Sequence, residues 1–419
     1  MSVEQIDTLV VGAGQAGIAL SEHLHNHEIP HLVLEKNRIA EAWRSGRWDS
    51  LVANGPAWHD RFPNRVFADT EPDGFPTKEQ VADYLVDYAT MIDAPIRTGV
   101  EVIHLEGNQG KAGFRVQTSA GMIQANSVVA ATGAFQYPAI PPVVPEQEHI
   151  KQIHSFHYRN PEQLPEGAVM VVGAGSSGAQ IADELQRAGK QVFLSVGPHE
   201  RPPRSYRGRD FVWWLGVLGL WDLATPKEGA EHVTISVSGA YGGQTMDFRR
   251  LAAEGVTLVG MTRVFDQGRL VFADDLQTNI ANGDASYLEM LDAADAYIAR
   301  TGIDLPEEPT ARGMLADPEC LVNPIRELDL NRAAVNSIIW ATGFRQDFSW
   351  MNVDTFDSNG VPMHQRGVSS VPGIYFLGLP WQSRRGSTFI WGVWHDAKHV
   401  ADQIAIQRTY LNYRGPNDN

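Results

Sequence analysis

The sequence predicts an α/β protein with two Rossmann-like dinucleotide-binding domains, one inserted into the other, and an additional α-rich insertion. Two glycine-rich turns, each after a run of apolar residues, are the first observation behind this prediction. The second is a pair of similar segments, SVVAATG and SIIWATG, in which a strand runs into Ala-Thr-Gly. With 419 residues, of which 43% are hydrophobic, the chain is large enough to form two cores.

The first glycine turn follows the apolar run at residues 6–11, which is typical of a buried parallel strand. Its glycines permit a tight turn, close approach of the backbone to a pyrophosphate, and close packing of the next helix. The next strand ends in Glu35, whose carboxylate can accept hydrogen bonds from an adenosine ribose. We assign this turn to FAD, with contacts from Gly12, Gly14, Gln15, Ala16, Gly17, Glu35 and Lys36.

The second glycine turn, GAGSSG, follows a similar strand at residues 168–172. Ser195 stands at the position of the ribose-binding carboxylate, and Arg201, Arg204, Arg207 and Arg209 follow it. A missing acid with arginines nearby is typical of a site for a 2′-phosphate, so NADPH is predicted over NADH. A solvated arginine-rich surface loop is the alternative interpretation. The predicted contacts are Gly173, Gly175, Ser176, Ser177, Gly178, Ser195, Arg201 and Arg204.

In flavoproteins with two dinucleotide-binding domains, segments like those at residues 127–133 and 337–343 carry the chain from one domain to the other. We expect Thr132, Gly133, Thr342 and Gly343 at the cofactors. The predicted organisation has three parts. These are a first FAD-domain segment at 1–160, an NAD(P)H domain at 161–345 with an insertion at about 210–330, and a C-terminal FAD-domain segment at 346–419.

Composition excludes several classes of function. Cys320 is the only cysteine, which leaves no disulfide, redox-active cysteine pair or cysteine-based metal site. A formal charge of −16 argues against nucleic acid as a partner. His23 and His27 have the spacing of metal ligands on a helix, but no carboxylate partner is evident and we predict no metal. The chain has no apolar run of about 18 residues and no secretory signal, so we expect a cytoplasmic protein without a membrane span.

Beyond the two turns, the chain resembles the flavin-containing monooxygenase family, the class B FAD/NADPH flavoprotein monooxygenases. Residues 50–56 look like the family's S-L-x-x-N-x-P segment, whose Asn, here Asn54, lies beside the flavin ring. Residues 75–89 are similar to the family's F-P and the helix that follows it. Trp43 stands where the family has Trp after a Gly-Gly pair, which is replaced here by Ala40 and Glu41.

A second departure concerns the family's F-x-G-x-x-x-H-x-x-x-F/Y fingerprint, of which only His154 and Tyr158 remain. The Baeyer–Villiger form of the fingerprint, which ends in Trp-Pro, is absent. His157 or Tyr158 could contact the nicotinamide, and a structural hydrogen bond is the alternative. The resemblance extends over roughly residues 1–205 and 335–419, whereas 210–330 has no clear match.

The resemblance implies that NADPH reduces FAD and that the reduced flavin captures O₂. A C4a-(hydro)peroxyflavin then inserts one oxygen atom into a small organic substrate by N- or S-oxygenation or Baeyer–Villiger chemistry. Asn54 is the expected catalytic residue, because an amide can hydrogen-bond the flavin or peroxide without donating an acidic proton. A turn-forming role is its alternative. An FAD-linked NAD(P)H reductase and a non-catalytic flavin-binding sensor also remain open.

The C-terminal region completes the expected site. Gly378 ends the last FAD-domain strand, and a helix at about 392–407 points its N-terminus at the flavin, where positive potential stabilises an anionic ring. Residues 383–394 would then line the flavin pocket. Within that segment we expect Arg384, Arg385 and Trp391 to orient an acidic or aromatic substrate, although ordinary packing explains Trp391 equally well. The insertion at 210–330 would cap the active site or form a homodimer contact.

Overall fold

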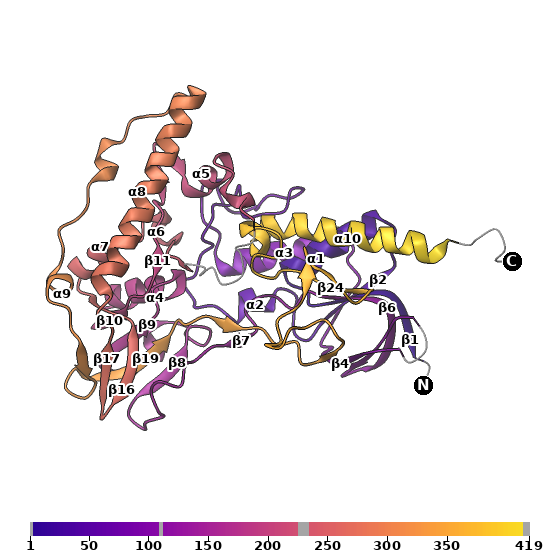
Figure 1. Cartoon of the computed structure of the whole chain (residues 1–419), viewed down its shortest axis with the longest axis horizontal. Helices are drawn as coiled ribbons and strands as arrows, with labels where there is room; N and C mark the ends of the chain where they lie inside the picture. Colours follow the sequence, from indigo (N-terminus) through magenta and orange to yellow (C-terminus); the bar gives the residue numbers. More distant parts are fainter. Residues whose placement is uncertain (1–2, 109–111, 225–233, 414–419) are drawn as a thin grey trace.

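Two sheets lie side by side along the long axis of the molecule (Figure 1). The computed structural model describes residues 3–108, 112–224 and 234–413. One sheet has ten strands and the other has five. No helix in the described part of the chain combines the length and apolar character needed to cross a membrane.

The larger sheet is built around five parallel strands in the order β3-β2-β1-β6-β24. These are β1 (Glu4–Val11), β2 (His31–Glu35), β3 (Ile96–Thr98), β6 (Gly121–Ala130) and β24 (Ile374–Phe376). β4 (Val102–Gly107) and β5 (Phe114–Thr118) extend β6 as an antiparallel meander. The short strands β21 (Met351–Asn352), β22 (His364–Gln365) and β23 (Val368–Ser369) complete the sheet. Three helices cover one face and share its apolar core: α1 (Gln15–Asn26), α3 (Lys78–Met91) and α10 (Ile390–Asn412).

The smaller sheet repeats the same plan with the parallel order β15-β10-β9-β19-β8. Its strands are β8 (Lys151–His154), β9 (Ala168–Val172), β10 (Val192–Ser195), β15 (Thr257–Val259) and β19 (Val335–Trp340). α4 (Ser176–Arg187) and α7 (Phe248–Ala253) cover one face. The meander of β16 (Thr262–Asp266), β17 (Arg269–Phe272) and β18 (Glu327–Asp329) covers the other. The repeated strand order confirms the predicted fold class of two Rossmann-like units.

The connections between the two units differ slightly from the expected boundaries. β8 belongs to the second sheet, although the sequence prediction placed residues 151–154 in the first domain. The two connecting segments pair with each other through β7 (Tyr137–Pro138) and β20 (Phe344–Arg345). The chain therefore leaves the first unit and returns to it at one place, directly after the two Ala-Thr-Gly segments.

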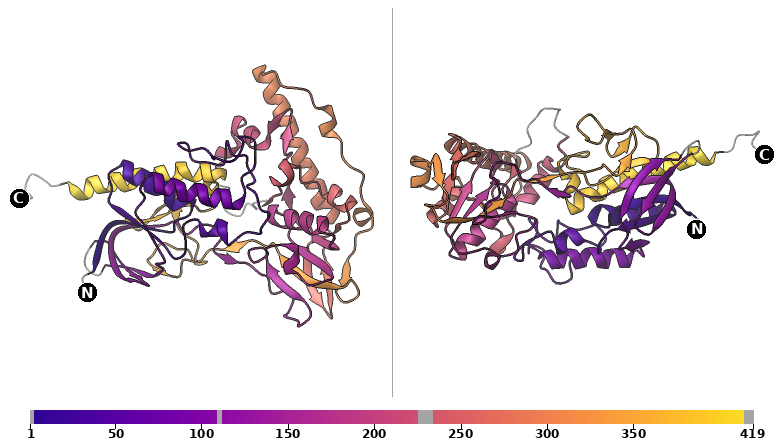
Figure 2. Two further views of the ribbon diagram at one scale, coloured as in Figure 1. Left: turned by 180° about the vertical axis from the view of Figure 1, so that it is seen from behind. Right: turned by 90° about the horizontal axis from the view of Figure 1, so that it is seen from below.

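The second unit also carries helices that have no counterpart in the first. α8 (Leu276–Thr301) follows β17 and extends away from both sheets (Figures 1 and 2). The segment after β10 runs along it and includes α5 (Phe211–Val217). Trp214 and Tyr206 pack with Tyr287 and Leu291 of α8 in a separate small core, so the aromatic residues of this region stabilise the insertion.

The shorter elements of the two units are α2 (Glu41–Arg44), α6 (Ala240–Gly243), α9 (Glu319–Val322), β11 (His199–Glu200), β12 (Ser205–Tyr206), β13 (Arg209–Asp210) and β14 (Thr234–Ile235).

Candidate active site

The first glycine turn has the geometry of a preformed dinucleotide cradle. Gly12 has a φ of +112°, and a Cβ on Gly17 would lie 1.9 Å from the Gly12 oxygen. At Gly14 the space around the missing side chain is open, as a bound pyrophosphate requires. The Glu35 carboxylate accepts a hydrogen bond of 2.9 Å from the amide of Ala13, which holds it at the turn. These residues fit the adenosine and pyrophosphate of FAD.

Side chains around this turn connect it to α2 and to the start of α10. The indole of Trp43 donates to Gln15 Oε1 at 3.1 Å, and Gln15 Nε2 donates to the carbonyl of Thr388 at 3.1 Å. Ala40, which replaces the first glycine of the family's Gly-Gly pair, adopts a left-handed conformation with φ of +59°. The backbone therefore keeps the shape that a glycine would supply, at some cost in strain. Lys36 is exposed to solvent.

The positions after the Ala-Thr-Gly strands and the last FAD-domain strand share a left-handed backbone. Gly133, Gly343 and Gly378 have φ between +79° and +82°, which favours glycine at each. Nothing lies within 4 Å of an added Cβ at Gly133 or Gly343, whereas Gly378 faces Ala16 at the first turn. Thr132 accepts a hydrogen bond from Gln136, and Thr342 donates one to the carbonyl of Ala139.

The second glycine turn has the same backbone geometry as the first, but its edge is covered. Gly173 has a φ of +110°, and a Cβ on Gly178 would lie 1.8 Å from the Gly173 oxygen. The hydroxyl of Ser176 donates to the carbonyl of Ile235 at 2.8 Å and accepts from the amide of Val237 at 3.2 Å. The segment at 235–238 thus takes up both hydrogen bonds of the Ser176 hydroxyl. A dinucleotide at this helix N-terminus would therefore be bound through the backbone amides.

Ser195, Arg201 and Arg204 do not converge in the structure. The Ser195 hydroxyl donates to the carbonyl of Gly260 at 2.9 Å, and both arginine residues are 3% exposed. Arg201 pairs with Asp284 at 2.7 Å and Arg204 pairs with Asp210 at 2.5 Å. Arg201 is thus held by α8, and Arg204 is held by Asp210 and by the backbone carbonyl of Asn54.

Asn54 lies where the two units meet. Its Oδ1 accepts a hydrogen bond of 2.9 Å from Nε2 of Gln180 on α4, which also donates to the Val237 carbonyl at 2.7 Å. Arg204 donates to the backbone carbonyl of Asn54 at 2.6 Å. Among the described residues the Nδ2 group of Asn54 has no protein partner, so the donor end of this amide is available to a ligand. Sequence reasoning missed Gln180 because a glutamine inside a helix carries no distinctive signal.

An aromatic pocket of about 320 Å³ lies beside the start of α10. It is lined by Trp58, His59, Arg61, Pro63, Trp391 and His395. His59 Nδ1 hydrogen-bonds the Asp60 carboxylate at 2.8 Å, its other ring nitrogen contacts the Trp391 indole N–H, and its ring stacks on Trp221. Asp60 also accepts from the amide of Gly55 at 3.1 Å, which connects this cluster to the turn that holds Asn54.

Arg61 gives this pocket a positive charge, and the Asp60 carboxylate beside it is hydrogen-bonded to His59. The Arg61 guanidinium donates to the carbonyls of Trp58 and Pro63, and in the described part of the chain it has no carboxylate partner. Trp391 is among the residues that line this pocket, and a substrate role for it would require such a position. Arg384 and Arg385 instead pair with Asp222 at 2.6 Å and Glu200 at 2.9 Å, which joins the end of the first unit to the second.

Three of the side chains singled out in the sequence, those of His27, His154 and Tyr158, have structural partners. His27 pairs with Asp402 of α10 at 2.8 Å, and the described residues contain no cluster of three His, Cys, Asp or Glu side chains that could hold a metal ion. His154 Nε2 hydrogen-bonds the carbonyl of Gly343 at 2.8 Å, and burial lowers the pKa of its imidazole. Tyr158 donates to Glu184 at 2.6 Å, and burial raises the pKa of its hydroxyl. His154 thus holds the segment that returns to the first unit, and Tyr158 packs within the second unit.

Comparison with known proteins places this arrangement in a family. Residues 9–209 match the family described as pyridine nucleotide-disulphide oxidoreductase. An uncharacterized oxidoreductase CzcO-like from Geobacillus kaustophilus is 37% identical over 404 residues, which cover 95% of this chain and 98% of the relative. The indole-3-pyruvate monooxygenase YUCCA1 of Oryza sativa is 26% identical over 95% of this chain and 91% of its own length. The chain belongs to the flavin-containing monooxygenase family.

The solved structures agree with this assignment at the level of the fold. A flavin-containing monooxygenase from Stenotrophomonas maltophilia superimposes with a TM-score of 0.66 and 19% identity, over 97% of this chain and all of the other. As a flavin-containing monooxygenase family member, the chain is a flavin-dependent oxidoreductase. Dithiol chemistry is excluded because Cys320, the single cysteine, is half-buried on α9 and has no second thiol to pair with.

Proposed function

We propose that the protein is an FAD-dependent monooxygenase that consumes a nicotinamide dinucleotide and inserts one oxygen atom into a small organic substrate. The flavin, when bound, accepts the hydride and activates O₂. FAD is proposed for the first cradle because Glu35 stands at the turn to accept ribose hydroxyls. The nicotinamide dinucleotide is proposed for the second cradle, at the N-terminus of α4.

The observation that carries this proposal is the position of Asn54 between the two cradles. One helical turn separates Gln180 from the start of α4, and Gln180 holds the acceptor end of the Asn54 amide. The donor end of the amide is then directed away from Gln180. A fixed neutral donor can hydrogen-bond the oxygen-reacting side of a flavin and deliver no acidic proton to it. A plain reductase has no need of such a group.

The aromatic pocket is the proposed substrate site. Trp58 and Trp391 offer flat apolar walls, and Arg61 supplies a positive charge that favours an anionic group. A small aromatic carboxylate matches both features, and the relative named as an indole-3-pyruvate monooxygenase acts on a compound of that class. Water exclusion at this pocket would be helped by the stacked rings of His59 and Trp221.

Anaerobic reduction followed by mixing with oxygen tests the proposed function. The purified protein is expected to be yellow, to bleach on addition of NADH or NADPH, and to reoxidise slowly in aerated buffer. A second assay supplies ¹⁸O₂ with indole-3-pyruvate as the trial substrate. Mass spectrometry of the product would then detect oxygen insertion. Immediate reoxidation without labelled product would support the reductase alternative, and failure to bleach would support a non-catalytic flavin sensor.

A further inference from the structure

We propose that the second cradle accepts a dinucleotide without a 2′-phosphate, so that NADH binds at least as well as NADPH. This inference rests on the proposed function, because it concerns the reductant of the same flavin. It reverses the NADPH prediction made from the sequence, which depended on Arg201 and Arg204. The two cradles have the same strand order, so equivalent positions in them can be compared directly.

The strand ends that would contact the ribose differ between the two units. In the first, the Glu35 carboxylate is turned toward the glycine turn and bonds the Ala13 amide. In the second, the Ser195 side chain is 2% exposed and turned the other way, where it bonds Gly260 and accepts from the amide of Thr262 at 3.0 Å. Ser195 therefore has no donor left to offer a phosphate oxygen.

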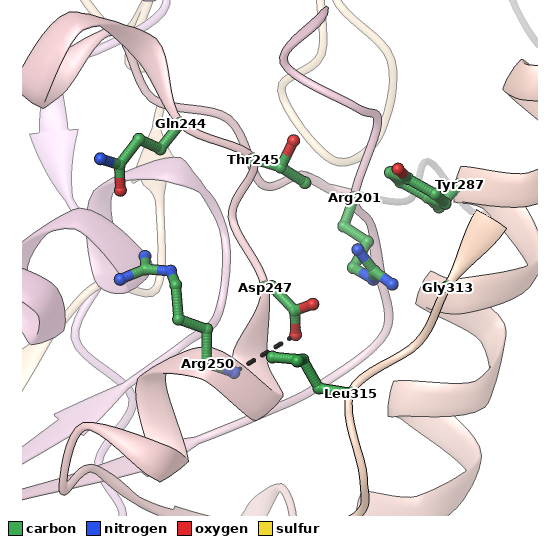
Figure 3. Close-up of a pocket in the computed structure, with 8 residues that line it drawn as sticks. All are labelled: Arg201, Gln244, Thr245, Asp247, Arg250, Tyr287, Gly313 and Leu315. Carbon is green, nitrogen blue, oxygen red and sulfur yellow. Dashed lines mark hydrogen bonds between the residues drawn. The ribbon is translucent and has the colours of Figure 1, made fainter. Parts of the chain in front are cut away.

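Arg201 is fully engaged by the inserted helix α8. Both its Nε and a terminal nitrogen donate to Asp284, at 2.9 and 2.7 Å, and the guanidinium lies over the ring of Tyr287. Figure 3 shows Arg201 beside Tyr287 at the edge of a pocket of about 290 Å³. Asp247 and Arg250 also line this pocket, so its charges are of both signs. Both donors go to Oδ1 of Asp284, whose Oδ2 pairs with Arg249, and a buried ion pair of this kind is costly to break.

The arginines that follow are engaged as well. Arg204 is held by Asp210, by the carbonyl of Asn54, and by the faces of Phe75 and Phe211. Arg207 pairs with Asp295 at 2.8 Å, farther along α8. Because α8 rises about 1.5 Å per residue, the contacts at residues 279, 284 and 295 show that Val196, Arg201 and Arg207 lie progressively farther along α8. Arg204 instead turns back to the carbonyl of Asn54.

The remaining charges near the end of β10 do not form a phosphate clamp. The carboxylate of Asp275 accepts from the amide of Met261 at 3.0 Å, and it stands beside the loop that holds Ser195. Arg263 is more than half exposed and lies 4.0 Å from Asp275. A carboxylate can accept hydrogen bonds from ribose hydroxyls but repels a phosphate that carries nearly two negative charges. The protein's formal charge of −16 adds to that repulsion.

Binding of nucleotide fragments tests the inference without any turnover. We expect 5′-ADP and 2′,5′-ADP to raise the thermal midpoint of the flavin-loaded protein equally at equal concentration. In stopped-flow reduction without oxygen, we expect the Kd for NADPH to be no lower than that for NADH. A Kd for NADPH more than about threefold lower, or a larger midpoint shift with 2′,5′-ADP, would overturn the inference.

Four variants sharpen the test. Gly197→Arg should lower the Kd for NADPH by about tenfold, because it places a guanidinium two residues after Ser195, where an added Cβ meets only the flexible side chain of Met261. Gly197→Ala is the matched control and should change neither Kd. Arg263→Ala and Arg250→Ala should leave the ratio of the two Kd values unchanged. A selective loss of NADPH binding in either would show that the molecule has a phosphate site after all, and the inference would be wrong.

Failure of the proposed function gives a different result from failure of this inference. If neither dinucleotide bleaches the flavin, the protein is no NAD(P)H-dependent enzyme. The fragment comparison still reports whether the 2′-phosphate is recognised.

Discussion

Replacement of Gln180 by leucine would test whether this side chain fixes the orientation of the Asn54 amide. Gln180 donates to Asn54 Oδ1 at 2.9 Å and to the carbonyl of Val237 at 2.7 Å. Leucine has a similar size and supplies neither hydrogen bond. The change therefore removes the hydrogen bond that keeps the oxygen of the Asn54 amide, and not its nitrogen, facing residue 180. It leaves the first glycine turn unchanged.

The size of the effect follows from the strength of one hydrogen bond. A neutral hydrogen bond contributes about 1 kcal/mol net, which corresponds to roughly a fivefold preference for one orientation of the amide. Without it, the two orientations become comparable and the Nδ2 donor faces the flavin in only about half of the molecules. If Asn54 slows loss of activated oxygen from the flavin, reoxidation should accelerate by up to about threefold, because the wrongly oriented fraction rises from about one sixth to about one half. Asn54→Ala removes the donor completely and should give at least as large an increase.

The assay is stopped-flow reoxidation of the reduced protein in aerated buffer, followed at the flavin absorbance, with no substrate required. Gln186→Leu is the matched control, because Gln186 lies on the same helix and donates to a different partner, the Glu254 carbonyl. The double variant of Asn54 and Gln180 should resemble Asn54→Ala alone, since both changes act through one group. Additive effects in the double variant, or an unchanged rate in Gln180→Leu beside a faster one in Asn54→Ala, would refute the coupling.

Three other predictions address the cradle, the aromatic pocket and the acid stability of the fold. Gly17→Ala should abolish bound flavin, measured by visible absorbance, because its Cβ would lie 1.9 Å from a backbone oxygen; Gly107→Ala, which has open space around it, should bind normally. Trp58→Ala should weaken quenching of tryptophan fluorescence by indole-3-pyruvate at least about tenfold, and an unchanged titration would remove the pocket from the mechanism. Burial lowers the pKa of His23 from 6.5 to about 4. The unfolded chain then binds more protons than the folded one between these values, so stability should fall by up to about 3 kcal/mol as the pH drops through that window. His23→Phe should flatten this dependence in urea unfolding, and an equally steep curve would contradict the assignment.

The parts of the fold that the sequence predicts are those set by local backbone constraints. Gly12 and Gly173 have φ near +110°, and a side chain at Gly17 or Gly178 would overlap a backbone oxygen. Only glycine satisfies these positions, so the pattern is visible without any knowledge of the fold. The same holds for Glu35, whose place at the end of a buried strand follows from the strand pattern.

The arginines show what local patterns cannot reveal. Arg201 follows the strand that carries Ser195 and therefore seems close to it, but its partner Asp284 lies 83 residues later on an inserted helix. No spacing rule links these two residues. Gln180 and Asn54 are 126 positions apart, and His59 and Trp391 are 332 apart. The Asn54–Gln180 contact depends on how the two units pack, and the other two depend on how distant segments pack within one unit. Packing of this kind is a property of surfaces rather than of sequence periodicity.

The packing of the two units also links the reductant to the oxygen side of the flavin. The proposed dinucleotide binds at the N-terminus of α4, and Gln180 lies within the first two turns of that helix. About 6 Å of helix separates the start of α4 from Gln180. Since Gln180 holds Asn54, any displacement of α4 when the dinucleotide binds or leaves would be transmitted to the Asn54 amide. Arg204 restrains the backbone of Asn54 from the same unit. We therefore expect flavin reoxidation to be slower when the oxidised dinucleotide remains bound, because only then is α4 held in place. Addition of excess NAD⁺ to reduced protein before oxygen tests this, and an unaltered rate would show that α4 and Asn54 move independently.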